Sequence, residues 1–175
     1  MNRYLPLLSF LFLQACIAQE ENSKNDICEF SFDEMMPCTF YNNNIEITTA
    51  IKATDIAEDE KLVDQLEVHM GKTKQTLKIT ENTSLLAGDI GFISCADINF
   101  DNQPDLAITT SFGTPNLYLD YWVFNLATQK YEYVGNYSEF TLDTKNKTIT
   151  TTVKDNAESY TTTKWYWQGT ELQQK

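Results

Sequence analysis

The chain has few of the side chains on which most catalytic and metal sites depend. It contains one histidine, His69, one arginine, Arg3, and only 6 glycines in 175 residues. A catalytic triad would have to use His69 alone, and its alternating segment is typical of an ordinary surface or core histidine. No phosphate-cradling glycine loop and no Cys/His spacing for zinc is present. A glycosidase carboxylate pair is possible among 25 acids, but its separation is not readable from sequence. We therefore do not expect an enzyme.

Positive charge is scarce as well. Lysine and arginine together number 13 against 25 acids, so the formal net charge is −12. Loss of residues 1–15 would also remove Arg3 and leave the chain more acidic still. Binding to nucleic-acid phosphates or to anionic headgroups needs the opposite sign, so neither is expected. A cationic protein partner would be attracted. The alternative is that the acidity serves solubility alone.

The first 15 residues have the pattern of an export signal. A basic start at residues 1–4 precedes an apolar run at residues 5–13, which is too short to cross a bilayer as a helix. The following Leu-Gln-Ala-Cys resembles a bacterial lipoprotein box, which implies cleavage before Cys16 and diacylglycerol on its thiol. Secretory cleavage after Ala18 is the alternative. We expect a cell-envelope protein, held to the membrane only by lipid, on the periplasmic face of the outer membrane because no aspartate follows Cys16.

The rest of the chain is expected to form one domain behind a tether. Residues 16–26 are polar and predict a flexible tether, which leaves residues 27–175 as a single domain with a real core. A disulfide is allowed outside the cytoplasm. We expect it between Cys28 and Cys38, because residues 33–37 would turn the chain back between them, and Cys95 would then be a buried thiol. Closing this loop would contribute about 2 to 3 kcal/mol.

Apolar and polar residues alternate with period two along the domain, as in half-buried strands. Only residues 54–62 look helical, with Thr54 as a cap. Short strands separated by turn signals about every 8 to 12 residues predict an all-β antiparallel meander, either a sandwich or a small propeller-like array. We expect strands at residues 38–53 with a break at 42–44, at 66–70, 77–79, 92–96, 106–111, 117–124, 131–134, 137–142, 148–153, 159–167 and 171–172.

Residues 97–105 have the ligand spacing of a calcium loop between two strands. Asn102 stands where such loops usually have glycine, and asparagine is the next most tolerant residue of a left-handed backbone. Ile108 stands where an EF-hand needs glutamate, so an EF-hand is not expected. The predicted Ca²⁺ ligands are the side chains of Asp97, Asn99, Asp101 and Asp105 and the backbone carbonyl of Gln103.

A metal-free turn is the alternative for this loop, because Asp and Asn favour turns through their own side-chain hydrogen bonds. Three carboxylates lie within nine residues, and no lysine or arginine lies among them. Like charges this close repel one another, so an ion is the simplest counter-charge.

The segment after the calcium loop combines a turn with an aromatic strand. In residues 117–124, Tyr118, Asp120, Trp122 and Phe124 share one face and Leu117, Leu119, Tyr121 and Val123 share the other, so at least one face is core. One interpretation is a protruding contact surface, and the alternative is that the aromatic side chains fill a sandwich core. The predicted partner contacts are Gly113, Thr114, Pro115, Asn116, Tyr118 and Tyr121.

Several stretches, taken together, carry a resemblance to a known family. They are the lipoprotein signal, Ala-Asp-Ile-Asn-Phe-Asp at residues 96–101 with Pro-Asp-Leu at 104–106, Asp-Tyr-Trp-Val-Phe at 120–124, and Trp-Tyr-Trp-Gln-Gly-Thr-Glu-Leu at 165–172. Over roughly residues 60–173 the chain resembles bacterial periplasmic lysozyme-inhibitor-like immunity lipoproteins.

The resemblance implies an all-β scaffold, bound Ca²⁺ on the loop residues named above, and inhibition of a peptidoglycan hydrolase by insertion of a loop into its cleft. The partner would be a basic lysozyme-like effector. No residue-level motif transfers for the inhibitory loop, so that prediction rests on local features. The alternative function is a calcium-dependent binding module for an envelope protein or a surface glycan.

Overall fold

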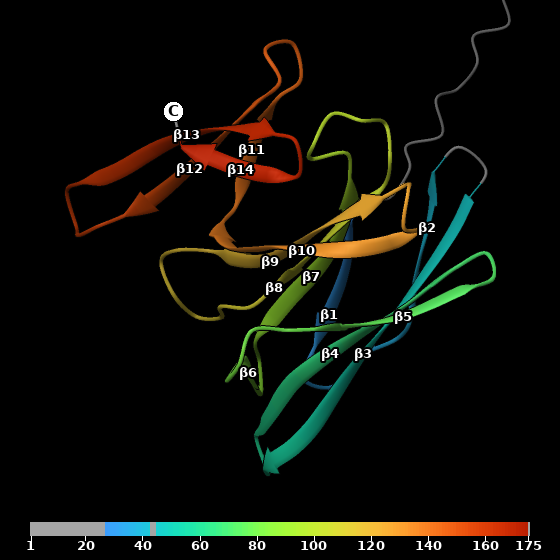
Figure 1. The fold of residues 1–175 in the computed structure, drawn as a ribbon. Coiled ribbons are helices and arrows are strands. Elements are labelled where there is room, and N and C mark those ends of the chain that lie inside the picture. Colours follow the sequence, from blue (N-terminus) through green and yellow to red (C-terminus); the bar gives the residue numbers. More distant parts are fainter. Residues whose placement is uncertain (1–26, 43–44, 175) are drawn as a thin grey trace, which may run out of the picture.

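The structure, a computed structural model, describes residues 27–42 and 45–174 (Figure 1). Within these residues the chain forms 14 strands in three antiparallel sheets and no helix, which confirms the predicted all-β class. It follows that this part of the chain holds no helix long and apolar enough to cross a membrane. The predicted signal, the lipidation site Cys16 and the tether lie outside the described residues.

The three sheets are stacked as layers. The central sheet has the order β1 (Ile27–Ser31), β7 (Ile90–Ala96), β8 (Asp105–Thr109), β9 (Tyr118–Asn125) and β10 (Lys130–Ser138). The N-terminal sheet has the order β2 (Cys38–Asn42), β3 (Ile45–Ala57), β4 (Glu60–Met70) and β5 (Thr73–Lys78), with β6 (Ser84–Leu86) also paired to β4. The C-terminal sheet has the order β11 (Phe140–Asp143), β12 (Thr148–Lys154), β13 (Tyr160–Gln168) and β14 (Glu171–Gln174). Figure 1 shows the C-terminal sheet above the central sheet and the N-terminal sheet below it.

The central sheet is covered on both faces. On β9, Trp122 and Phe124 belong to the larger core shared with the N-terminal sheet, whereas Leu119 and Tyr121 belong to a smaller core shared with the C-terminal sheet. The alternation read from the sequence is therefore confirmed, and the expectation of at least one core face is met on both faces of this strand. All five residues of β8 are buried, as a strand in the middle of a middle layer requires.

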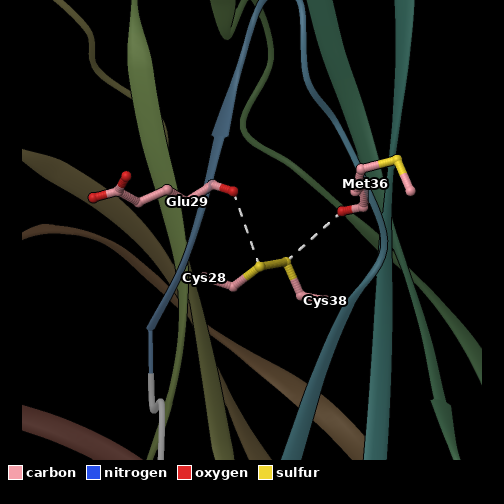
Figure 2. Close-up of a disulfide and its surroundings, with 4 residues drawn as sticks. All are labelled: Cys28, Glu29, Met36 and Cys38. Atoms are coloured by element: carbon pink, nitrogen blue, oxygen red, sulfur yellow. Dashed lines mark hydrogen bonds between the residues drawn. A yellow bond between two sulfur atoms is a disulfide. The ribbon is translucent and has the colours of Figure 1, made fainter.

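The predicted disulfide is present and joins two sheets. Cys28 of β1 and Cys38 of β2 are bonded, with their Cα atoms 6.1 Å apart (Figure 2). Because β1 belongs to the central sheet and β2 to the N-terminal sheet, the disulfide links these two sheets covalently. Cys95 of β7 takes no part in it and is buried, as expected.

Two local predictions are wrong. Residues 54–62 are not helical, because β3 and β4 continue through them as one long hairpin in which Thr54 pairs with Leu62 and Ala57 with Glu60. Pairing with a neighbouring strand has overridden a weak capping signal. Residues 135–136, expected to separate two strands, lie inside the continuous strand β10, which has a bulge next to Gly135. Its φ of 147° and the Tyr137 ring, 2.6 Å from where a Cβ would lie, both require glycine there.

Candidate functional site

The acidic loop, residues 97–105, lies between β7 and β8 and curls around its own backbone. The Asp97 carboxylate accepts hydrogen bonds from the backbone N–H groups of Asp101 at 3.0 Å and Asn102 at 2.8 Å. The Asn99 side-chain oxygen accepts from Asp101 N at 3.2 Å, and the Asp101 carboxylate accepts from Gln103 N at 2.8 Å. The side-chain oxygens of alternate residues thus accept the loop's own N–H groups, which the metal-free turn predicts as well.

The turn in this loop falls where the calcium-loop pattern places it. Asn102 has a φ of 65°, in the left-handed region that asparagine tolerates. Phe100 has a φ of 63°, which the sequence does not suggest and which is costly for a residue with a bulky side chain. Two left-handed residues within three positions fold the loop back tightly on itself.

Asp105 ties the loop to the central sheet. Its side chain is 1% exposed, and its two oxygens accept backbone N–H groups from Ile98 at 2.9 Å, Asn99 at 3.3 Å and Phe124 at 2.8 Å. Burial raises the pKa of this carboxyl to about 7, and the negative charge of Asp101 acts in the same direction, while the three N–H groups oppose the rise. Asp105 thereby links the loop, β8 and β9.

The loop fits a Ca²⁺ ion in part. Asp97, Asn99 and Asp101 carry side-chain oxygens within one turn, and such oxygens are the ligands that Ca²⁺ prefers. Asp97 and Asp105 each use both carboxylate oxygens on backbone N–H groups, and Asp101 uses its two on Gln103 N and the Asn99 side-chain amide. Across residues 27–42 and 45–174, no three acidic, histidine or cysteine side chains are grouped to hold a metal. The turn at Asn102 agrees with the calcium-loop pattern, and binding of Ca²⁺ by the five residues stays a prediction.

The C-terminal sheet contacts the acidic loop from above. The Trp167 indole N–H donates to the backbone carbonyl of Ile98 at 2.8 Å, and the Lys147 ammonium lies 3.5 Å from the carbonyl of Phe100. The sequence carries no signal for these contacts beyond the family resemblance around Trp167, because Trp167 and Ile98 are 69 residues apart in the chain. The loop is therefore held between two sheets.

The β8–β9 loop, residues 110–117, has an exposed tip at residues 113–115. Ser111 stands at its base, where the hydroxyl donates to Asn116 O at 3.0 Å and accepts from Tyr118 N at 2.7 Å. The Thr114 hydroxyl also donates to Asn116 O, at 2.6 Å. These bonds close the loop upon itself, so its tip is ordered before any partner arrives.

Only part of the predicted partner surface is available. Gly113, Thr114 and Pro115 are exposed, and Tyr118 is half-buried. The Asn116 side-chain amide is engaged inside the molecule, donating to Lys154 O at 3.1 Å and accepting from Lys154 N at 2.7 Å.

The prediction for Tyr121 is wrong. Its ring is 4% exposed and stacks on Phe140 with ring centroids 3.9 Å apart. Its hydroxyl accepts a hydrogen bond from Phe140 N at 3.0 Å. The C-terminal sheet covers this side chain, so it cannot reach a partner.

The exposed tip lies beside acidic residues from other parts of the chain. A Cβ placed on Gly113 would be 3.9 Å from the Asp89 carboxylate. Below the tip, the Phe112 ring packs edge-on against Phe30 of β1 at 6.2 Å. Asp59, in the β3–β4 turn, accepts a backbone hydrogen bond from Ala87 at 2.9 Å, which brings the acidic end of that hairpin close to Asp89.

A second buried carboxylate and two cavities lie on the side of the molecule where β5 approaches β10. Asp120 is fully buried and accepts hydrogen bonds from Thr80 N and Oγ1, both at 2.6 Å, from Tyr133 OH at 3.0 Å and from Asn136 at 2.9 Å. Cavities of about 750 Å³ and 470 Å³ flank the end of β5. With every Asp120 contact made inside the protein, this carboxylate serves to join the central and N-terminal sheets.

Comparison of the chain with protein-family models, with curated proteins and with solved structures finds no significant match. The resemblance to lysozyme-inhibitor lipoproteins therefore stays a prediction from the residues that carry it.

Proposed function

We propose that this chain is a lipid-anchored protein of the bacterial cell envelope that binds and blocks a basic peptidoglycan hydrolase. The observation that carries the proposal is the exposed tip at residues 113–115. It is closed by the hydrogen bonds of Ser111 and Asn116 and stands beside Asp89. An ordered loop of this kind loses little conformational freedom on entering a cleft, which favours tight binding.

Charge supports the same partner. Lysozyme-like hydrolases that act on the anionic cell wall commonly carry a net positive charge, and the formal net charge of this chain is −12. Opposite charges accelerate encounter and exclude wrong partners more than they add affinity. Asp89, beside the tip, and the acidic β3–β4 turn would concentrate this attraction near the part of the loop that enters the hydrolase cleft.

The proposal includes a Ca²⁺ ion held by Asp97, Asn99, Asp101, Asp105 and the carbonyl of Gln103. When bound, the ion would neutralise the carboxylates of the acidic loop. Its role would be structural, because the loop fastens β7 to β8 and touches the C-terminal sheet rather than the β8–β9 loop. Attachment through Cys16 and a periplasmic location belong to the same proposal.

A surface on the C-terminal sheet favours a second candidate, a calcium-dependent module that binds an envelope protein or a surface glycan. Tyr160, Lys164 and Tyr166 alternate along β13 and share the face opposite Trp167, which packs on the smaller core. All three are exposed. Exposed tyrosines on one face of a sheet give aromatic area with a polar tip, which suits recognition of sugars or of a protein.

An inhibition assay tests the first proposal. The mature chain, with calcium, is added to a panel of basic lysozymes and bacterial muramidase toxins, and initial rates of peptidoglycan hydrolysis are measured. We expect at least one enzyme to be inhibited. Pro115→Arg, at the tip, should weaken that inhibition at least tenfold, whereas Thr170→Arg, with the same added charge in the β13–β14 turn, should not.

The result has clear alternatives. If every enzyme in the panel stays fully active, the proposal is overturned. If Pro115→Arg and Thr170→Arg inhibit equally, the tip is not the inhibitory element. Retention of the wild-type chain on immobilised envelope glycan, lost in Tyr160→Ala and Tyr166→Ala, would favour the second candidate.

A further inference from the structure

The open edge between the central and N-terminal sheets contains a cavity of about 470 Å³. It is lined by residues of β5 and β10, which are the last strands of these two sheets, and by the residues that follow β5. Pockets for small ligands typically have volumes of about 300 to 1,000 Å³. Four lining residues are buried in the larger core, namely Leu77, Ile79, Trp122 and Tyr131. The lining residues that a ligand can reach are Gln75, Thr76, Lys78, Thr80, Glu81 and Tyr133.

Two polar bridges join the edges of the sheets at this cavity. In the first, the Gln75 side-chain amide donates to the backbone carbonyl of Tyr131 and accepts from its N–H, both at 2.8 Å. In the second, Thr80 donates to the Asp120 carboxylate from its N–H and from its hydroxyl, both at 2.6 Å. Because Gln75 and Thr80 both line the cavity, the bridges hold its walls in place before any ligand arrives.

A buried carboxylate supports one wall of the cavity. Asp120 is fully buried, and no ion pair among the described residues includes it. Burial of a charge without a cation is costly, so its hydrogen bonds must compensate. The side chains of Thr80, Tyr133 and Asn136 donate to it at 2.6, 3.0 and 2.9 Å. All three residues are exposed, so the buried charge fixes the orientation of side chains at the surface.

These hydrogen bonds determine what the wall offers to a ligand. A hydroxyl has one proton, and Thr80 and Tyr133 both donate theirs to Asp120. Their oxygens therefore remain as acceptors, and a matching ligand must donate. Lys78 and Glu81 pair with each other at 2.8 Å, so the reachable lining residues add no net charge. The cavity thus suits an uncharged molecule that carries hydroxyl groups.

Tyr133 gives the cavity an aromatic surface. Its side chain is 54% exposed although its hydroxyl is bonded to Asp120, and its ring centroid lies 5.7 Å from that of Trp122. The ring is therefore held in place while part of it stays open to solvent. The face of an aromatic ring is electron-rich and attracts groups with a positive edge, such as C–H bonds. A sugar ring combines such C–H groups with donor hydroxyls.

We propose that this cavity binds one ring of a saccharide. The C–H face of the sugar would lie on Tyr133, and its hydroxyls would donate to the Thr80 oxygen and contact the Lys78–Glu81 pair. Asp120 would act as a positioning residue, because it holds Thr80 and Tyr133 without touching the ligand. The proposal goes beyond inhibition of a hydrolase and does not depend on it. It also uses different side chains from the tyrosines of the C-terminal sheet.

A titration with defined saccharides tests the cavity. The full mature chain is followed by ¹H–¹⁵N NMR as chitotriose, cellotriose or maltotriose is added, with sorbitol as a control that has hydroxyls but no ring. We expect saturable shifts of the backbone amides of residues 75–81 and 131–133 with at least one trisaccharide, and none with sorbitol. The proposal is overturned if no trisaccharide gives saturable shifts, if sorbitol gives the same shifts, or if the shifts map elsewhere.

Matched variants locate the contact. Thr76→Arg adds a long side chain at an exposed position of the lining and should weaken binding about tenfold or more, whereas Thr170→Arg, with the same added charge, should not. Tyr133→Ala should abolish saturation, whereas Tyr160→Ala, which removes an exposed tyrosine of the C-terminal sheet, should leave it intact. Binding that survives in both Thr76→Arg and Tyr133→Ala would rule out this cavity.

The positioning role of Asp120 has a separate readout. Tyr133→Phe keeps the ring but removes its hydrogen bond to Asp120, so we expect the dissociation constant of the trisaccharide to rise about fivefold. The amide spectrum shows whether the variant is fully folded, so a loss of stability is not mistaken for a loss of binding. Equal dissociation constants for the wild type and Tyr133→Phe would show that Asp120 joins the sheets and does not position the ligand site.

Discussion

Replacement of Asp105 by asparagine should change how the stability of the protein depends on pH. The carboxyl is 1% exposed, and burial raises its pKa from the ordinary value of 3.8 to about 7. A rise of this size corresponds to about 4 kcal/mol, at about 1.36 kcal/mol for each pKa unit. Because an amide does not ionise, Asp105→Asn removes the whole effect while keeping the shape of the protonated carboxyl.

The sign follows from proton binding. Between the unfolded and folded pKa values of Asp105, the folded chain binds more protons than the unfolded chain, so the free energy of unfolding falls as the pH rises. From pH 4.5 to pH 7.5 this loss is about 3 kcal/mol for the wild type. The other acids are common to both proteins, so the difference between wild type and variant isolates Asp105.

Urea unfolding followed by tryptophan fluorescence measures the effect. Both proteins are unfolded at several pH values across this range in EDTA, with the disulfide intact. We expect the wild type to lose about 3 kcal/mol relative to Asp105→Asn as the pH rises. If the free energies of unfolding of the two proteins change with pH in parallel, within about 0.5 kcal/mol, the argument that burial raises the pKa of Asp105 is refuted. Saturating Ca²⁺ should lessen the wild-type slope, because a nearby cation lowers the pKa of the carboxyl.

Three further predictions concern the loops and the disulfide. Asn116→Ala removes both hydrogen bonds to the Lys154 backbone and should lower the free energy of unfolding by about 1 to 3 kcal/mol in urea, whereas Thr170→Ala should change it little. Ca²⁺ at 100 times its dissociation constant should add about 2.7 kcal/mol, so EDTA should lower the Tm of calcium-loaded protein, and an unchanged Tm would contradict the site. Cys28→Ser/Cys38→Ser should cost about 2 to 3 kcal/mol, and an unaltered urea midpoint would show that the bridge does not stabilise the fold.

Local features of the sequence were sufficient for much of the fold. Period-two alternation located most strands, since the side chains of a strand point to opposite faces whatever the strand pairs with. The hairpin β4–β5 and the turn at Asn102 follow from short-range chemistry in the same way. The disulfide could also be predicted from the sequence, because a short turn joins residues 28 and 38.

Predictions that depended on distant partners were less successful. Residues 54–62 look helical in isolation, but β3 and β4 pair through them. The acidic loop was predicted as a set of five ligands, and the role of Asp105 in holding β9 was missed because Phe124 is 19 residues away.

The sequence by itself determined the all-β class, the acidity, the curled acidic loop and the alternating faces of β9. Each depends on neighbouring residues, on composition, or on the period of a single strand. The tertiary structure alone decided which of those residues a partner can reach. Tyr121 and Asn116 are residue types that are common in contact surfaces. The C-terminal sheet nevertheless covers the Tyr121 ring and forms hydrogen bonds with the Asn116 side chain. Burial depends on what packs against a strand from elsewhere in the chain, and no local pattern contains that information.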